Sequence, residues 1–486
     1  METLKQKTAK GLFWGALNSG TTQILNLVIG IVLARRLSQA DYGIVGVLTI
    51  FTAIAGNLQS SGFTQGLINL ERPTDRDYNS VFSFNVLMSI TMYAVLFLSA
   101  PLIATFFHQP CLVSVSRVVF LTFLIASLGI AHGGYLTKNM MNKELAIIGA
   151  VALITSGSVG IILAFVYKNY WALAWQQVTY ITVINLGRYY YVRDWRPRLT
   201  LDFGPVRRMF RFSVKILITN IINTLSSNVL TPIFGHLFPI RQVGNYSQAF
   251  KWDTMAHSLV GNTVGQIAQA VMVESISERE EAGTTRQLRI FRKMVRFTCF
   301  LAMPLMFGLA IVGDEFIILT IGERWRACVP LLQVLCISGA FMPIYTMYQN
   351  LAISQKRSDV YMWLNIGQIV LQIAVILAFY HYGMFVMVCA YSAFIILWLL
   401  PWHHYAGRLV GYRWREMICD LLPFTLAAAA VMATTYLATM AIQQPLLLIA
   451  SRFTMAAILY YVIMKVAKVE ILRECEDFVI KKIRRK

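Results

Sequence analysis

The sequence predicts an all-α polytopic membrane protein with about 14 transmembrane helices. Only 14% of its 486 residues are charged and 57% are hydrophobic, whereas about a quarter of the residues in a soluble protein are charged. Apolar runs long enough to cross a hydrocarbon core of about 30 Å recur along the whole chain. Because backbone inside lipid must satisfy its own hydrogen bonds, these runs should be helices. They lack the alternation of apolar and polar residues that the strands of a membrane β-barrel show.

Fourteen apolar segments are long enough to cross the bilayer as helices, at about 1.5 Å per residue. In the first half of the chain they cover residues 11–34, 42–63, 80–106, 112–136, 145–167 and 169–192. In the second half they cover residues 209–234, 243–272, 294–321, 328–353, 361–380, 383–404, 421–441 and 445–465. The connections are short, so we expect no soluble domain between the spans.

Two similar turns indicate an internal repeat. Residues 34–46 read ARRLSQADYGIVG and residues 234–246 read FGHLFPIRQVGNY, with Gly43 matching Gly244 at an offset of 201. Each turn joins two long apolar segments, so spans one to six and seven to twelve should be two copies of one unit. Because six is even, both copies point the same way, which is a parallel pseudo-two-fold repeat. The predicted domains are a lobe at 1–208, a second lobe at 209–420, and two additional helices with a basic tail at 421–486.

The distribution of charge predicts the orientation. The N-terminus, the even-numbered loops and the C-terminus hold 29 of the 43 lysines and arginines, and the odd-numbered loops hold six. Positive residues favour the cytoplasmic side, so both termini should be cytoplasmic. Topology then explains the net charge of +20, and we expect no nucleic-acid partner. The basic tail could also touch anionic headgroups, but a plain topology signal is the favoured interpretation.

The spans carry no pattern typical of catalysis. No nucleophile–base constellation, glycine-rich phosphate loop or cysteine–histidine cluster with metal-ligand spacing occurs in the sequence. We therefore expect a protein that is not an enzyme and that needs no cofactor or metal. A two-lobed membrane protein without soluble machinery is most simply a transporter that alternates between inward-open and outward-open states.

Two stretches resemble a known family. Residues 11–46, GLFWGALNSGTTQILNLVIGIVLARRLSQADYGIVG, resemble the first hairpin of the polysaccharide-exporter branch of the MOP superfamily, which contains the lipid-linked oligosaccharide flippases. Residues 321–339, IGERWRACVPLLQVLCISG, resemble the colanic-acid-exporter type within that branch. The resemblance implies two six-helix lobes around a central hydrophilic cavity, with the extra helices beside a groove for a lipid tail.

The same resemblance implies a function. A member of this family would move undecaprenyl-diphosphate-linked oligosaccharide across the bacterial inner membrane for the synthesis of O-antigen, capsule or exopolysaccharide. Its partners would be this lipid-linked substrate and membrane lipids, with polysaccharide polymerase and glycosyltransferase machinery as further candidates. We expect it to work as a monomer.

Lys251 is the leading candidate for binding the substrate diphosphate. It lies eight residues from the outer end of its span, roughly 12 Å deep at 1.5 Å per residue. A charge at such depth is costly and is a functional candidate by default. The alternative is a structural ion pair, for which Asp314 and Glu315 are the best partners because the spans of the first lobe contain no acid.

Other polar residues in the spans have a functional and a structural interpretation each. Arg117 and Lys215 could face the diphosphate or extend toward headgroups, and Arg452, also a functional candidate by its depth, could extend toward headgroups as well. Asp253 and His257, four residues apart, could relay a proton or form a hydrogen-bonded packing pair. The candidates for sugar contacts, which could instead join helices, are Asn18, Gln23, Asn57 and Gln59.

Three alternatives remain open at this point. A cation-coupled multidrug exporter of the same superfamily would need membrane carboxylates for cationic cargo, and the first lobe has none. A lipid II flippase would share nearly all of the features above. A membrane-embedded glycan polymerase or ligase should carry a large periplasmic loop, whereas every outer loop here is short.

Overall fold

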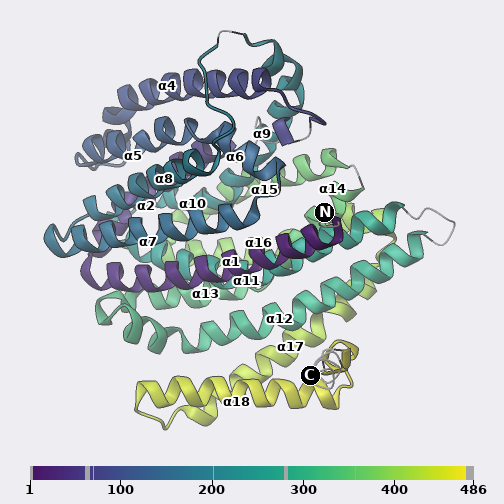
Figure 1. Cartoon of the computed structure of the whole chain (residues 1–486). Helices are drawn as coiled ribbons and strands as arrows, with labels where there is room; N and C mark the ends of the chain where they lie inside the picture. Colours follow the sequence, from purple (N-terminus) through teal and green to yellow (C-terminus); the bar gives the residue numbers. More distant parts are fainter. Residues whose placement is uncertain are drawn as a thin grey trace. The chain divides into compact units, whose positions relative to one another are not determined.

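A computed structural model of the chain describes residues 4–60, 66–68, 70–200, 202–277, 283–355, 357–474 and 476–477. Within these ranges the regular structure is helical and contains no β-strand (Figure 1). Contacts divide the chain into two compact units, Met1–Ser247 and Gln248–Lys486. The boundary between these units falls inside the helix Ile240–Ser277 and not after residue 208, where the predicted repeat divides. The two boundaries differ because one is defined by compactness and the other by internal repetition. The repeat boundary after residue 208 stays a prediction.

The helices follow the fourteen predicted spans in order. The first six spans fall on α1 (Leu4–Arg36), α2 (Gln39–Ser60), α4 (Asp75–Phe106), the pair α5 (Leu112–Ser127) and α6 (Ile130–Lys138), α7 (Asn142–Val166) and α8 (Trp171–Tyr191). The next six fall on the pair α9 (Gly204–Asn228) and α10 (Leu230–Leu237), α11 (Ile240–Ser277), α12 (Gly283–Thr320), the pair α13 (Val329–Gly339) and α14 (Met342–Ser354), α15 (Ser358–Phe379) and α16 (Met384–Ala406). The last two are α17 (Trp414–Thr439) and α18 (Pro445–Val466).

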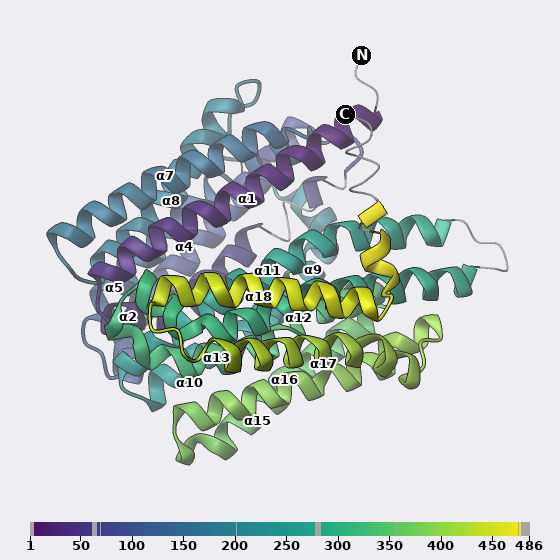
Figure 2. The same ribbon diagram turned by 90° about the horizontal axis from the view of Figure 1, so that it is seen from below.

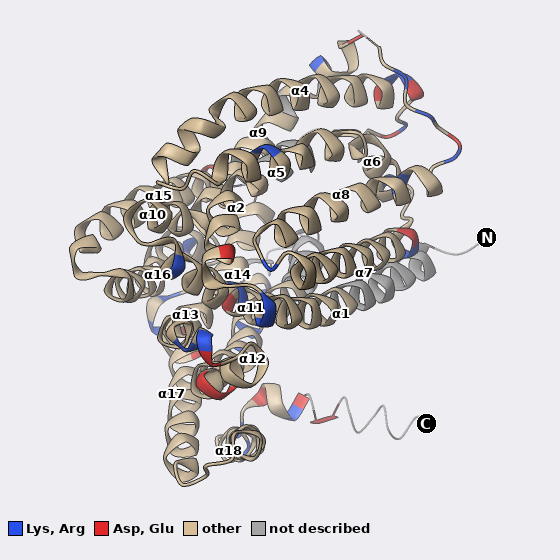
Figure 3. Cartoon of the chain, turned by 90° about the vertical axis from the view of Figure 1, so that its left-hand side faces the viewer, with Lys and Arg blue, Asp and Glu red and all other residues tan. Residues whose placement is uncertain are grey.

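The helices differ in how apolar they are. Eight of those described are long and apolar enough to cross a membrane, or nine if α5 and α6 count as one bent span. Figure 3 shows long stretches of α4 and α7 without a charged residue. The remaining five predicted spans lie on α1, α2, α8, α9 and α11. The described part of α2, Gln39–Ile54, is a shorter apolar helix.

The fourth span of each copy is broken, which the sequence analysis did not predict. In the first copy α5 and α6 meet at Gly129 with a bend of 46°, and in the second copy α13 ends at Gly339 before α14 begins. A break inside a span frees backbone carbonyls, which need new partners in a membrane. Side chains of α8 supply them, since Arg188 donates to the Gly129 carbonyl at 3.2 Å and Tyr189 donates to that of Leu128 at 3.0 Å.

The loop before α9 folds back onto the start of α4. Trp195 is buried and its ring lies 5.4 Å from that of Tyr78. The backbone N–H groups of Arg198 and Thr200 donate to Asn79 and Ser83 of α4, at 2.9 and 2.8 Å. These contacts anchor a loop that the sequence marks only as charged.

The two similar turns contact each other within the first unit. A methyl group built on Gly43 would overlap the carbonyl oxygen of Ile240, and one built on Gly244 would overlap that of Gln39. At the offset of 201, Gln39 corresponds to Ile240, so the contact is reciprocal. Arg241 Nε also donates to Gln39 Oε1 at 2.6 Å. Close approach of two backbones explains why both turns carry glycine.

Candidate functional site

Lys251 lies on α11, away from any described acid that could neutralise it. Its side chain is half-buried, and its Nζ lies 6.0 Å from the ring centre of Trp252. The two acids expected to neutralise it are engaged elsewhere. Asp314 pairs with Arg326 at 3.3 Å, and Glu315 pairs with Arg452 at 2.8 Å. Among the described residues, no carboxylate lies within ion-pair distance of Lys251.

Asp253 and His257 lie on a more buried part of the same helix. The Asp253 side chain is 5% exposed, and its Oδ2 lies 3.9 Å from His257 Nε2. Its other oxygen, Oδ1, has no hydrogen-bond partner. A methyl group built on Gly339 would overlap this oxygen, so Asp253 faces the end of α13 where the span breaks. The structure thus brings Asp253 and His257 near each other but pairs neither with Lys251.

The remaining candidates from the sequence are placed only in part. Arg117 belongs to the first unit, where its guanidinium lies over the ring of Phe97 at 4.1 Å and its Nε is buried without a partner. Gln23 is half-buried and takes part in an interaction with another residue. Of the remaining candidates, four have side chains that the structure does not describe, namely Lys215, Asn18, Asn57 and Gln59.

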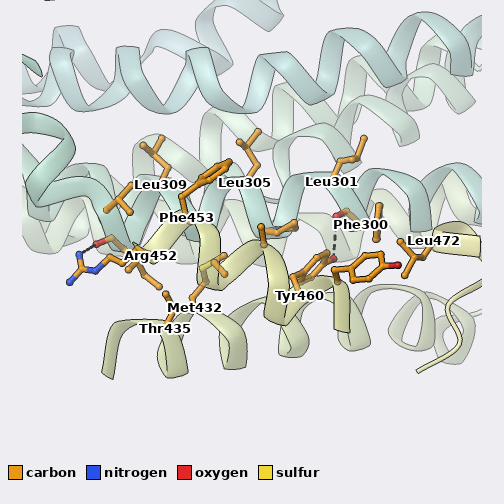
Figure 4. A pocket seen from close by; sticks show the side chains of 17 residues that line it. Phe300, Leu301, Leu305, Leu309, Met432, Thr435, Arg452, Phe453, Tyr460 and Leu472 are labelled. Carbon is orange, nitrogen blue, oxygen red and sulfur yellow. Dashed lines mark hydrogen bonds between the residues drawn. The ribbon is translucent and has the colours of Figure 1, made fainter. Parts of the chain in front are cut away.

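An apolar groove runs between α12, α17 and α18. These three helices pack against one another (Figure 2), and the groove has a volume of about 530 Å³. Its walls include Leu301, Leu305 and Phe453, with Arg452 at one end and Tyr460 at the other (Figure 4). A surface of this kind fits a hydrocarbon chain and offers little to a sugar.

Arg452 does not extend toward headgroups, which corrects one interpretation of the sequence. Its side chain is 6% exposed. Its Nη1 donates to Glu315 Oε2 at 2.8 Å and to the Ile311 carbonyl at 2.9 Å, and its Nε donates to Thr439 Oγ1 at 3.2 Å. An acid on α12 therefore holds the arginine inside. Sequence reasoning missed this pair because its two charges lie 137 residues apart.

We expect Arg452→Met to destabilise the protein strongly. Removing one member of a buried ion pair leaves Glu315 charged without a partner, which costs about 3–5 kcal/mol. The melting temperature in detergent should fall by several degrees, and the double variant Arg452→Met/Glu315→Gln should recover part of the loss. Arg326→Met is the matched control, because that arginine is 59% exposed and surface pairs contribute about 1 kcal/mol or less. An unchanged melting temperature for Arg452→Met would contradict the structural role of the pair.

The structure and the comparisons define the class. Among solved structures, the chain is similar to lipid II flippase MurJ in an inward closed conformation, with a TM-score of 0.76 and 12% identity over 95% of this chain and all of that one. It is also similar to an outward-facing multidrug resistance MATE family transporter of the MOP superfamily, with a TM-score of 0.52 and 14% identity over 83% of this chain and 96% of that one. The fold is that of an all-α polytopic membrane transporter with about fourteen helices, six plus six in repeat and two added.

Sequence comparison gives the family. The model of the family described as "Polysaccharide biosynthesis protein" matches residues 32–330, and the chain belongs to this family. Teichuronic acid biosynthesis protein TuaB of Bacillus subtilis (strain 168) is 24% identical over 417 residues, covering 85% of this chain and 83% of that protein. Lipopolysaccharide biosynthesis protein WzxC of Escherichia coli (strain K12) is 24% identical over 372 residues, covering 75% of this chain and 73% of that protein.

Proposed function

We propose that this protein is a flippase that moves undecaprenyl-diphosphate-linked oligosaccharide across the bacterial inner membrane for surface polysaccharide synthesis. Both termini lie in the cytoplasm, and transport proceeds by alternating access. Family membership supports the link to polysaccharide synthesis, as do relatives named for teichuronic acid and lipopolysaccharide biosynthesis.

The observation that carries the proposal is the unpaired charge of Lys251. A lysine held in a membrane helix without a carboxylate nearby is costly unless a ligand or water compensates it. A diphosphate supplies the compensating charge and accepts several hydrogen bonds from an ammonium group. Arg117 and Lys215 are the further candidates for this group. The sugar would contact Asn18, Gln23, Asn57 and Gln59.

The lipid tail fits the groove between α12, α17 and α18. Burying a methylene group contributes about 0.8 kcal/mol, so the free energy of a long prenyl chain strongly favours its staying on an apolar surface. The diphosphate could then pass through the polar interior while the tail remains in an apolar setting. Asp253 and His257 are the candidates for coupling this movement to protons, because a histidine changes charge near neutral pH.

Two other functions remain as alternatives. A cation-coupled multidrug exporter would hold its cargo with carboxylates, but Glu315 is already paired and Asp253 is buried against α13. A lipid II flippase would use the same anion chemistry, and a likeness at 12% identity concerns the fold alone. The protein works as a monomer without a cofactor, and polymerase or glycosyltransferase machinery supplies and consumes its cargo.

Protein purified in detergent should bind a polyprenyl-diphosphate sugar and should not bind a lipophilic cation such as tetraphenylphosphonium. The reason is the sign of the unpaired charge, which attracts the anion and repels the cation. The measurement is thermal stabilisation in detergent over a range of ligand concentrations, since a ligand that binds the folded state raises the melting temperature. Stabilisation by the cation alone would favour the multidrug exporter.

A further inference from the structure

The second unit contains a basic pocket that the proposed transport path does not use. It has a volume of about 680 Å³ and lies between the N-terminal part of α12, the first turns of α17 and the segment after α18. Five cationic side chains line this basic pocket, namely Arg289, Arg292, Lys293, Arg296 and Lys468. Among the described lining residues, Glu470 is the one acid.

Two of the arginines are fixed in place by a buried acid. Asp420 is fully buried and accepts from Arg292 Nε at 2.8 Å and from Arg296 Nε at 2.5 Å. Glu416 accepts from Arg292 Nη1 at 2.8 Å, and Tyr412 donates its hydroxyl to Asp420 at 3.0 Å. Two carboxylates on α17 therefore orient two arginines on α12. The Nη groups of Arg296 remain available to a ligand.

Two further cations have no partner among the described residues. Arg289 and Lys468 are exposed, and neither makes an ion pair or side-chain hydrogen bond within the part of the chain that the structure describes. By contrast, Lys293 is neutralised by Glu474 at 2.6 Å. The available positive charge is thus concentrated on Arg289, Lys468 and the outer face of Arg296.

The wall of the basic pocket that adjoins the groove is apolar. Phe424 lines the basic pocket, and its ring contacts that of Phe300, which lines the groove, at 6.5 Å between centres. Ile471 lines the basic pocket and Leu472 lines the groove. A cationic recess beside an apolar groove fits an amphiphile with an anionic head.

We propose that the basic pocket binds the phosphate headgroup of an anionic phospholipid of the cytoplasmic leaflet. The proposal rests on the orientation given under the proposed function, which puts the pocket at the level of the cytoplasmic headgroups. Basic pockets between membrane helices on that side are suited to phosphate headgroups. Oriented arginines together with two unpaired cations favour a resident lipid over a cargo that must leave after each cycle. The bound lipid would bridge α12 to the two added helices.

The test compares lipid binding by two charge-matched double variants. Arg289→Gln/Lys468→Gln removes the two unpaired cations of the pocket, and Arg408→Gln/Arg415→Gln removes two exposed cations of the same unit that do not line it. Asp420 is left intact, because its loss would leave two arginines without a partner. Native mass spectrometry measures the binding of dioleoylphosphatidylglycerol and of dioleoylphosphatidylcholine.

Wild type and the control variant should bind phosphatidylglycerol more tightly than phosphatidylcholine. The pocket variant should bind phosphatidylglycerol at least tenfold more weakly, because it lacks two basic residues that each contribute to binding near a membrane surface. Equal binding by the pocket and control variants would overturn the proposal. Displacement of phosphatidylglycerol from wild type by equimolar undecaprenyl diphosphate would also overturn it, in favour of the cargo. Lys251→Gln should bind phosphatidylglycerol like wild type, because Lys251 does not line the basic pocket. A failure of the transport proposal would appear in export by this variant and would leave its lipid binding unchanged.

Discussion

A disulfide between positions 46 and 247 should abolish export. A Cβ built on Gly46 lies 3.4 Å from Ser247 Cβ, close to the 3.5–4.5 Å that disulfides span. The two positions are equivalent at the offset of 201, so they mark the point where the predicted copies face each other. If the copies rock apart during transport, this contact must open. Oxidised Gly46→Cys/Ser247→Cys should then export at background level, and a reductant should restore it.

The single variants Gly46→Cys and Ser247→Cys, oxidised in the same way, control for the native cysteines. Surface glycan in a strain lacking the native gene gives the export, and mass spectrometry of the linked peptides gives the cross-linking yield. Undiminished export from fully cross-linked protein would show that this contact stays closed throughout the cycle.

Removal of the charge at position 251 should be the second large effect. Lys251→Gln should lower export at least tenfold, since a cationic hydrogen bond to a diphosphate contributes about 1.5–3 kcal/mol. Lys251→Glu should export least, because it places like charge against the cargo. Lys251→Arg keeps the charge and should retain part of the activity, although a planar guanidinium differs in shape from an ammonium group.

The amount of protein in the membrane separates this role from a structural one. Because no described carboxylate pairs with Lys251, Lys251→Gln should accumulate like wild type. A structural ion pair would instead leave a buried acid uncompensated and lower the amount of protein. Lys465→Gln is the control, since Lys465 is exposed near the end of α18. Normal glycan from Lys251→Glu would exclude Lys251 from the cargo site and make Arg117 the next candidate.

The helices could be predicted because each span carries its own signal. Length and hydropathy are local properties, so all fourteen predicted spans fall on helices or helix pairs. The break at Gly129 could not be predicted in this way. Its carbonyls are satisfied by α8 side chains about 60 residues further on, and no local pattern reports such a partner.

In the candidate site too, local features could be predicted and contacts between distant segments could not. The scarcity of acids already suggested an unpaired Lys251, and the structure agrees for the residues it describes. The pairing of Arg452 with Glu315 and the basic pocket were missed, because each joins charges from separate helices. Those charges look like ordinary headgroup anchors when α12, α17 and α18 are considered one at a time.

The reciprocal contact of the two turns has a consequence for the origin of the chain. Gly43 meets the backbone of Ile240, and Gly244 meets the backbone of Gln39, the residue equivalent to Ile240. Such reciprocal contacts form when one surface binds a second copy of itself across a two-fold axis. If the two predicted copies descend from one six-helix unit, that unit would have formed this contact as a homodimer. In the present chain the contact is intramolecular, so a side chain added at either glycine would require the opposite turn to move.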